Sequence, residues 1–145
     1  MRARDSSPFR ELLLDAATTA ATDAHAEHHD HVHAASVTST SDGCIDPGAL
    51  LDLLEEPPAG VYRLKGTVAV RYRGRVRSYV VNVVGTSIHV ATAPPTARAN
   101  CLVAIGTQFD VDHTRALVAA ALRPHDGIVA AAGIRRLQRY RRLSF

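Results

Sequence analysis

"VYRLKGTVAVRYRGRVRSYVVNVVG", residues 61–85, alternates apolar and polar side chains along most of its length. Val68 and Val70 fall on one side of an extended chain. Arg71 and Arg73 fall on the other side. A period of two residues is typical of a half-buried strand. The central RYRGRVR predicts a hairpin turn at its glycine, flanked by solvated arginines. We therefore predict two antiparallel strands in this stretch.

Further strands are predicted on both sides of this hairpin. In its second half, Val76, Val80 and Val84 share one face, and Gly85 marks a turn into SIHVA. NCLVAIG is a continuous apolar run and predicts a buried strand. TAPPTARA before it predicts a loop, because adjacent prolines cannot join a strand ladder. AASVTSTSD, residues 34–42, predicts the first strand of the sheet.

Two helices carry recognisable start and stop signals. In IDPGALLDLLEEPP, Asp46 is an N-cap, Pro47 fits the first helical position, and the leucines form an apolar stripe that ends at two prolines. In VDHTRALVAAAL, the preceding Asp110 predicts the cap and Pro124 the end.

A third helix is predicted at the C-terminus, from Ile128 through GIRRLQRYRRLSF. Ile134 and Leu137 would face the body of the protein, and the arginines would face water. The predicted order is β-α-β-β-β-β-α followed by this basic helix. The fold class is therefore α+β, with helices packed on one face of a mainly antiparallel sheet.

The segment HAEHHDHVH precedes the first predicted strand and holds five of the chain's eight histidines. Neutral imidazole is a good ligand for zinc, cobalt, nickel and copper. Large apolar side chains are nearly absent from this region, so we expect a flexible linker. The candidate metal ligands are His25, His28, His29, His31 and His33.

Three interpretations of this segment remain open. It binds metal adaptably, which we favour, or it forms one ordered site, or it is an inert tether. Zinc or cobalt is the expected metal. His89, His113 and His125 are isolated in the sequence, and we expect them on the surface or in packing roles.

Composition excludes several classes of protein. With two cysteines far apart, Cys44 and Cys101, neither a disulfide framework nor a cysteine-based zinc site is expected. Cys101 lies in an apolar run and is predicted to be buried. No apolar run reaches the roughly 18 residues that a membrane span requires. We expect a cytoplasmic protein without membrane contact.

Nucleotide and nucleic-acid binding are also disfavoured. GVYRLKGT is a near miss to a phosphate-binding P-loop, but its Lys65 precedes the glycine and the segment is predicted to be a strand. The formal net charge is only +3, and the C-terminal arginines lack an aromatic platform. We therefore expect no nucleotide on this chain and consider nucleic acid an unlikely partner.

The order of these elements resembles the C-terminal domain of the CobW family, P-loop GTPases of metal homeostasis. The resemblance rests on DPGALLDLLEE, VYRLKG and LVAIGTQFD, after a histidine-rich linker, and covers roughly residues 36–122. The positions that match the family pattern are Asp46, Pro47, Arg63, Lys65, Gly66, Ile105 and Gly106.

The resemblance implies four segments. Residues 1–20, with FRELLLDAA, look like the end of that family's GTPase domain, and residues 21–35 are the histidine-rich linker. Residues 36–124 form the CobW-like domain, and residues 125–145 the basic helix. The family's P-loop and Cys-x-Cys-Cys metal motif are absent from this sequence, so the chain is not expected to be an enzyme on its own.

The implied function is that of an accessory domain of a metallochaperone. Its expected partners are a P-loop GTPase domain, in cis in a longer protein or in trans, and a metalloprotein client. Self-association of the isolated chain is a further expectation, because the sheet exposes a face that such a GTPase domain would cover. The alternatives are a module that docks protein or RNA through its sheet and arginine-rich helix, and a non-functional remnant of a truncated gene.

Overall fold

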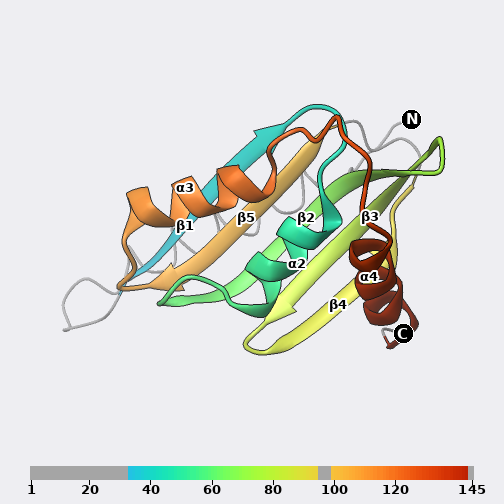
Figure 1. The fold of residues 1–145 in the computed structure, drawn as a ribbon. Helices are drawn as coiled ribbons and strands as arrows, with labels where there is room; N and C mark the ends of the chain where they lie inside the picture. The colour runs from blue at the N-terminus through green and yellow to red at the C-terminus, as the bar shows by residue number, and fades with distance from the viewer. Residues whose placement is uncertain (1–32, 95–98, 144–145) are drawn as a thin grey trace, which may run out of the picture.

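The computed structural model describes residues 33–94 and 99–143 of the chain. Its centre is a five-stranded sheet with the order β1-β5-β2-β3-β4, in which every neighbouring pair is antiparallel (Figure 1). The strands are β1 (Ala34–Ser41), β2 (Val61–Tyr72), β3 (Arg75–Val84), β4 (Ser87–Thr92) and β5 (Asn100–Thr107).

Three helices cover one face of this sheet, which we call the helix face (Figure 1). They are α2 (Pro47–Glu55), α3 (Val111–Ala121) and α4 (Ala131–Leu143). The predicted α+β class and element order are confirmed. We call the opposite side of the sheet the far face. Among the described residues, no helix is both long enough and apolar enough to cross a membrane.

The predicted caps fix α2 and α3 in place. The Asp46 side chain accepts a hydrogen bond from the Gly48 backbone nitrogen, and Pro47 opens α2. The leucine stripe of α2 is buried against the sheet. At α3, the Asp110 carboxylate accepts from the His113 backbone nitrogen at 2.9 Å.

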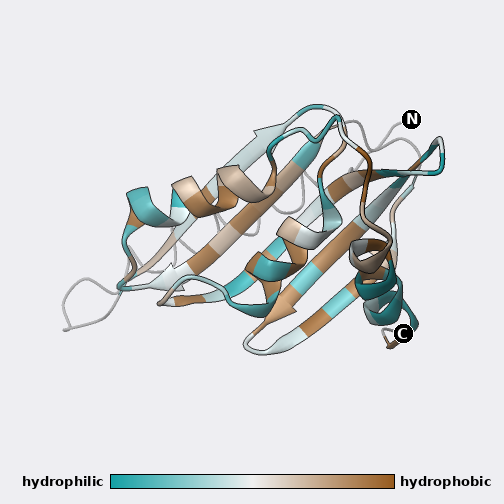
Figure 2. Cartoon of the chain, in the orientation of Figure 1, coloured by the Kyte–Doolittle hydropathy of each residue, from teal (hydrophilic) through white to brown (hydrophobic). Residues whose placement is uncertain are grey.

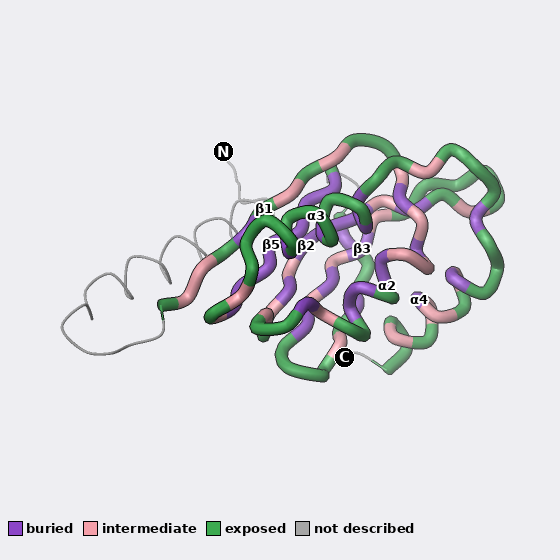
Figure 3. Tube along the Cα trace, turned by 60° about the vertical axis from the view of Figure 1, so that its left-hand side comes forward, coloured by how far each residue is buried: buried purple, intermediate pink, exposed green. Residues whose placement is uncertain are grey.

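The core lies between the helices and the sheet, where Figure 3 shows many of the buried residues. Val68 and Val70 of β2 are buried there, as the alternation predicted. In β3 the buried residues are Tyr79, Val81 and Val83, and Figure 2 shows hydrophilic residues interrupting the hydrophobic ones along this strand. The side chains of directly paired residues share a face, so β2 and β3 contribute to one core.

Val76, Val80 and Val84, which the sequence pattern placed on one face of this strand, lie on the opposite side of β3 from the core. Val76 and Val84 lie on the far face and are 51% and 52% exposed. A period of two shows that these residues share a face but not which face the helices cover. β5 is buried on both faces, and Cys101, Val103 and Ile105 form a separate cluster on the far face.

Two polar or small residues fix the packing around β5. The buried Asn100 side chain donates to Ser41 Oγ and the Gly43 carbonyl, and accepts from the Ala69 nitrogen at 2.8 Å. It therefore joins β1, β2 and the loop before α2. At Gly66, a Cβ atom would lie 2.0 Å from the Cys101 carbonyl oxygen. The absence of a side chain at Gly66 therefore lets the β2 and β5 backbones approach closely.

The predicted start of the C-terminal helix is wrong. α4 begins at Ala131, and Ile128 lies before it with 98% of its surface exposed. α4 packs closely against the start of α2 at Gly133, because a Cβ there would lie only 3.0 Å from the Gly48 nitrogen. Leu137 is buried and Ile134 packs against the core, as predicted.

Candidate functional site

The histidine-rich segment leads directly into the sheet. His33 is exposed and immediately precedes β1, which pairs with β5 at one edge of the described sheet. The other four predicted ligands, His25, His28, His29 and His31, lie outside the described residues. The structure therefore places the end of the tether at one edge of the sheet, and its use as a metal site stays a prediction.

The remaining histidines do not converge. His89 and His113 are exposed on β4 and α3. The His125 backbone nitrogen donates to the Cys44 carbonyl at 2.8 Å, which gives this residue a structural role. Within residues 33–94 and 99–143, no three His, Cys, Asp or Glu side chains are grouped closely enough to hold a metal ion.

Cys101 is unsuited to metal binding or nucleophilic chemistry. Its side chain is buried on the far face, as predicted, and burial raises the pKa of its thiol to about 12. Metals and electrophiles react with the thiolate, which is scarce at neutral pH when the pKa is this high. Cys101 is therefore a small packing residue.

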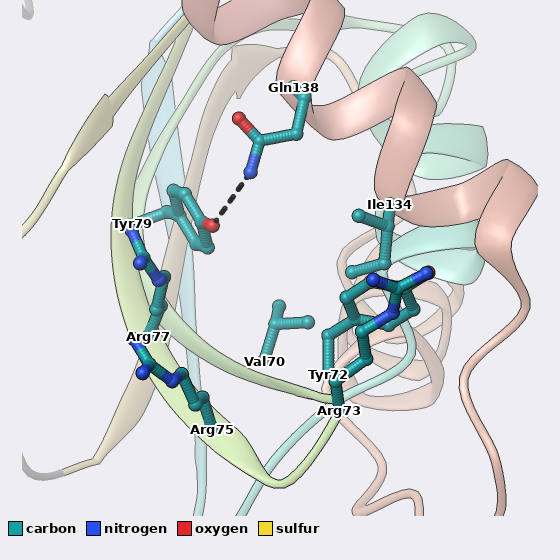
Figure 4. A pocket seen from close by; sticks show the side chains of 8 residues that line it. All are labelled: Val70, Tyr72, Arg73, Arg75, Arg77, Tyr79, Ile134 and Gln138. Atoms are coloured by element: carbon teal, nitrogen blue, oxygen red, sulfur yellow. Dashed lines mark hydrogen bonds between the residues drawn. The ribbon is translucent and has the colours of Figure 1, made fainter.

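A cavity of about 410 Å³ lies between the β2–β3 hairpin and α4 (Figure 4). Val70 and Ile134 give it apolar surface. Tyr79 and Gln138 close another side, where Gln138 Nε2 donates to the Tyr79 hydroxyl at 3.4 Å. Tyr72 lines the cavity near the tip of the hairpin.

The charged residues of this cavity all carry the same sign. Arg73, Arg75 and Arg77 line it, and the described lining residues include no carboxylate (Figure 4). Arg75 pairs with Tyr72 and Arg77 pairs with Val70 across the hairpin, so all four residues lie on the helix face. The core face of the hairpin therefore changes from aliphatic to cationic as it approaches the turn.

A second polar cluster joins α4 to α2. Arg136 Nη2 lies 2.8 Å from Glu55 Oε1, and Arg136 Nη1 lies 3.1 Å from Asp52 Oδ1. The Tyr140 hydroxyl donates to Glu55 Oε2 at 2.6 Å. This hydrogen bond and the Arg136 guanidinium, opposed by desolvation, lower the pKa of Glu55. Arg136 therefore binds acids of its own chain, which corrects the prediction that all arginines of this helix face water.

Sequence reasoning missed the cavity and the Arg136 cluster. The lining of the cavity could have been predicted from RYRGRVR, because a two-residue turn fixes which residues of the two strands pair. Counting by twos from the turn puts Tyr72, Arg75 and Arg77 on the face of Val70. The Arg136 cluster depends on how α4 crosses α2, and a single sequence holds no signal for that crossing.

Comparison with known families gives a match over most of the described chain. Residues 34–122 match the family described as the cobalamin synthesis protein cobW C-terminal domain. No P-loop domain matches the chain. No protein with a curated description matches it.

Two solved structures of the YjiA GTPase have a similar chain path. The Zn(II)-bound E. coli protein is 19% identical, with a TM-score of 0.46 over 61% of this chain and 29% of that one. A Zn(II)-bound triple mutant is 18% identical, with a TM-score of 0.47 over 62% of this chain and 30% of that one. The chain thus spans less than a third of the length of these structures. The chain belongs to the family defined by the CobW C-terminal domain.

Proposed function

We propose that this chain is a metal-handling accessory domain that binds zinc or cobalt through its histidine-rich segment and docks on a P-loop GTPase. The observation that carries the proposal is the position of the segment. Five histidines lie within nine residues, and His33 immediately precedes an edge strand of a CobW C-terminal domain. A metal held there is attached to the body yet remains accessible to another protein.

The chemistry of the ligands suits this role. An imidazole nitrogen is a good ligand for zinc and cobalt. Because all five histidines lie on one short stretch, bringing several of them to one metal ion costs little loop entropy. Asp23, Glu27 and Asp30 are interleaved with the histidines. Their carboxylates supply hydrogen bonds that orient imidazole rings or oxygen ligands that complete a coordination shell.

The body contributes a docking surface rather than catalysis. The three described helices occupy the helix face, and the far face carries the exposed Val76 and Val84. We assign the far face to the P-loop GTPase domain, which would supply nucleotide hydrolysis. The accessory domain then recognises a metalloprotein client and delivers the metal to it.

Metal titration of the full chain tests the proposal. Replacing the five tether histidines with asparagine should weaken zinc and cobalt binding by at least about tenfold, because each lost nitrogen ligand removes a coordinate bond. The matched control replaces the three body histidines and should leave metal affinity unchanged. The five substitutions are His25→Asn, His28→Asn, His29→Asn, His31→Asn and His33→Asn. The control carries His89→Asn, His113→Asn and His125→Asn.

Two results would contradict this function. Unchanged zinc and cobalt affinity in the five-histidine variant would remove the metal proposal and favour a protein- or RNA-docking module. Release of phosphate from GTP by the purified chain would show that the body carries a nucleotide site of its own.

A further inference from the structure

The cavity beside the β2–β3 hairpin gathers positive charge that the described chain does not neutralise. Its three arginines, Arg73, Arg75 and Arg77, all belong to one short hairpin. Among the described residues, none of these three arginines forms an ion pair with a carboxylate. Guanidinium groups stay charged at every physiological pH, so their mutual repulsion persists until an anion enters.

The chemistry of the lining defines what kind of anion fits. A guanidinium presents several N–H donors in a planar fork that matches the paired oxygens of phosphate. Arg75 and Arg77 lie two residues apart on β3, so their side chains leave the same face of the sheet side by side. Two adjacent forks suit a phosphate group, which carries up to two negative charges.

The shape of the cavity indicates a small molecule. Its volume of about 410 Å³ falls within the range of roughly 300–1,000 Å³ typical of small-molecule sites. Ile134 and the Tyr72 ring are partly exposed and offer apolar surface beside the cations, and the buried Val70 lies behind them in the lining (Figure 4). Inorganic phosphate would leave this surface uncovered, whereas the organic part of a phosphate ester would cover it.

The hairpin turn carries the third arginine of the cavity. Arg73 has φ +53 and Gly74 has φ +76, which form a two-residue turn of the kind that normally carries Asn-Gly. This turn type requires a positive φ at both residues, so the left-handed backbone of Arg73 belongs to the turn. The Arg73 guanidinium lies 5.2 Å from the centre of the Tyr72 ring and adds a third cation to the cavity.

We propose that this cavity is a binding site for a small organic phosphate ester. Arg75 and Arg77 hold the phosphate, Arg73 closes over it from the turn, and Ile134 and Tyr72 contact the organic part. This site is independent of the histidine-rich segment, so it neither requires nor supports metal binding by the tether.

Calorimetric titration of the full chain with adenosine 5′-monophosphate and with inorganic phosphate, at physiological ionic strength, tests the site. The monophosphate should bind and adenosine should not, since the phosphate provides the attraction. Arg75→Gln with Arg77→Gln should weaken monophosphate binding by at least about tenfold. The matched control, Arg115→Gln with Arg123→Gln, removes the same charge from exposed positions outside the cavity and should bind as the parent does.

Each other outcome has a defined meaning. Equal weakening in both double variants would show attraction by net charge alone and overturn the site. Binding of inorganic phosphate as tight as that of the monophosphate would overturn the role of the apolar surface. Much tighter binding of a single-stranded oligonucleotide would identify a nucleic-acid surface instead. Circular dichroism verifies that both variants are folded, which is expected because the replaced side chains are exposed.

Discussion

Two glycines, Gly66 and Gly106, are required because the backbone of another segment lies very close to them. At Gly66 the backbones of β2 and β5 approach too closely for a side chain. At Gly106 the loop before β2 does the same, since a Cβ there would lie 2.2 Å from the Gly60 carbonyl oxygen. Both glycines stand in the sequence pattern shared with the CobW family. Their role is therefore structural, although Lys65-Gly66 superficially resembles part of a phosphate-binding loop.

Gly66→Ala is expected to destabilise the protein severely, by roughly 3 kcal/mol or more, because the new methyl group overlaps the backbone of β5. Chemical denaturation followed by circular dichroism measures this loss. Gly48→Ala is the control, since a Cβ there meets nothing closer than 3.6 Å and sits inside a helix. It should change stability by no more than about 1 kcal/mol, in the stabilising direction. Equal stability of both variants would contradict the packing argument.

At the level of elements, α4 is held to α2 by polar contacts as well as by Leu137. Glu55 receives both the Arg136 guanidinium and the Tyr140 hydroxyl. Because the Tyr140 hydrogen bond and Arg136 lower the pKa of Glu55, the folded state favours its charged form. That contribution to stability is complete above the ordinary pKa of 4.5 and is lost as the pH falls through the lower, folded-state value.

Glu55→Gln should therefore lower the free energy of unfolding by roughly 1 kcal/mol at neutral pH, and the deficit should shrink progressively below pH 4.5. Urea denaturation across this pH range measures the difference. Asp112→Asn is the matched control, because Asp112 is 98% exposed in its pair with Arg115 and should matter little. A deficit that stays constant as the pH falls would show that the carboxylate charge plays no part.

The β2–β3 hairpin carries a conflict between stability and the proposed ligand. Arg73→Asn should stabilise the protein by up to about 1 kcal/mol, since asparagine tolerates the left-handed backbone better. The same change should weaken phosphate-ester binding, because one cation is lost. Gln108→Asn is the control at φ +51, and it should stabilise without affecting the ligand. Thermal unfolding and calorimetry measure the two effects, and unchanged binding by Arg73→Asn would remove Arg73 from the site.

Most of the elements could be predicted from the sequence because their signals are local. Period-two alternation identified β2 and β3, a continuous apolar run identified β5, and Asp46 and Asp110 identified the helix starts. The start of α4 could not be predicted from the sequence. The residues just before Ala131 also suit a helix, and the close contact of Gly133 with Gly48 depends on tertiary packing. The far-face position of Val76 likewise depends on where the helices dock.

The whole molecule presents two unlike faces, one covered by helices and one that carries exposed valines. Val76 and Val84 lie on the far face, the surface that we assign to a GTPase domain, and both are more than half exposed. Apolar residues on an open sheet face favour contact between copies.

Reversible self-association is therefore expected at high concentration of the isolated chain. Val76→Ser with Val84→Ser should weaken it, as measured by sedimentation velocity. Val111→Ser with Leu117→Ser is the matched control, because these α3 residues are also partly exposed, at 37% and 38%, but lie away from the far face. Weaker association in the control alone would place the contact on α3.

The strand pairing places the start of β1 and the β2–β3 turn far apart in the sheet. Ala34 pairs with Thr107 beside the start of β2, whereas the arginine-bearing turn follows the end of β2. The 12 residues of β2 span roughly 36 Å at about 3.3 Å each. His33, directly before β1, and a phosphate ester bound at the turn would thus lie at opposite ends of β2. A protein that contacted both would need to reach along the full length of that strand.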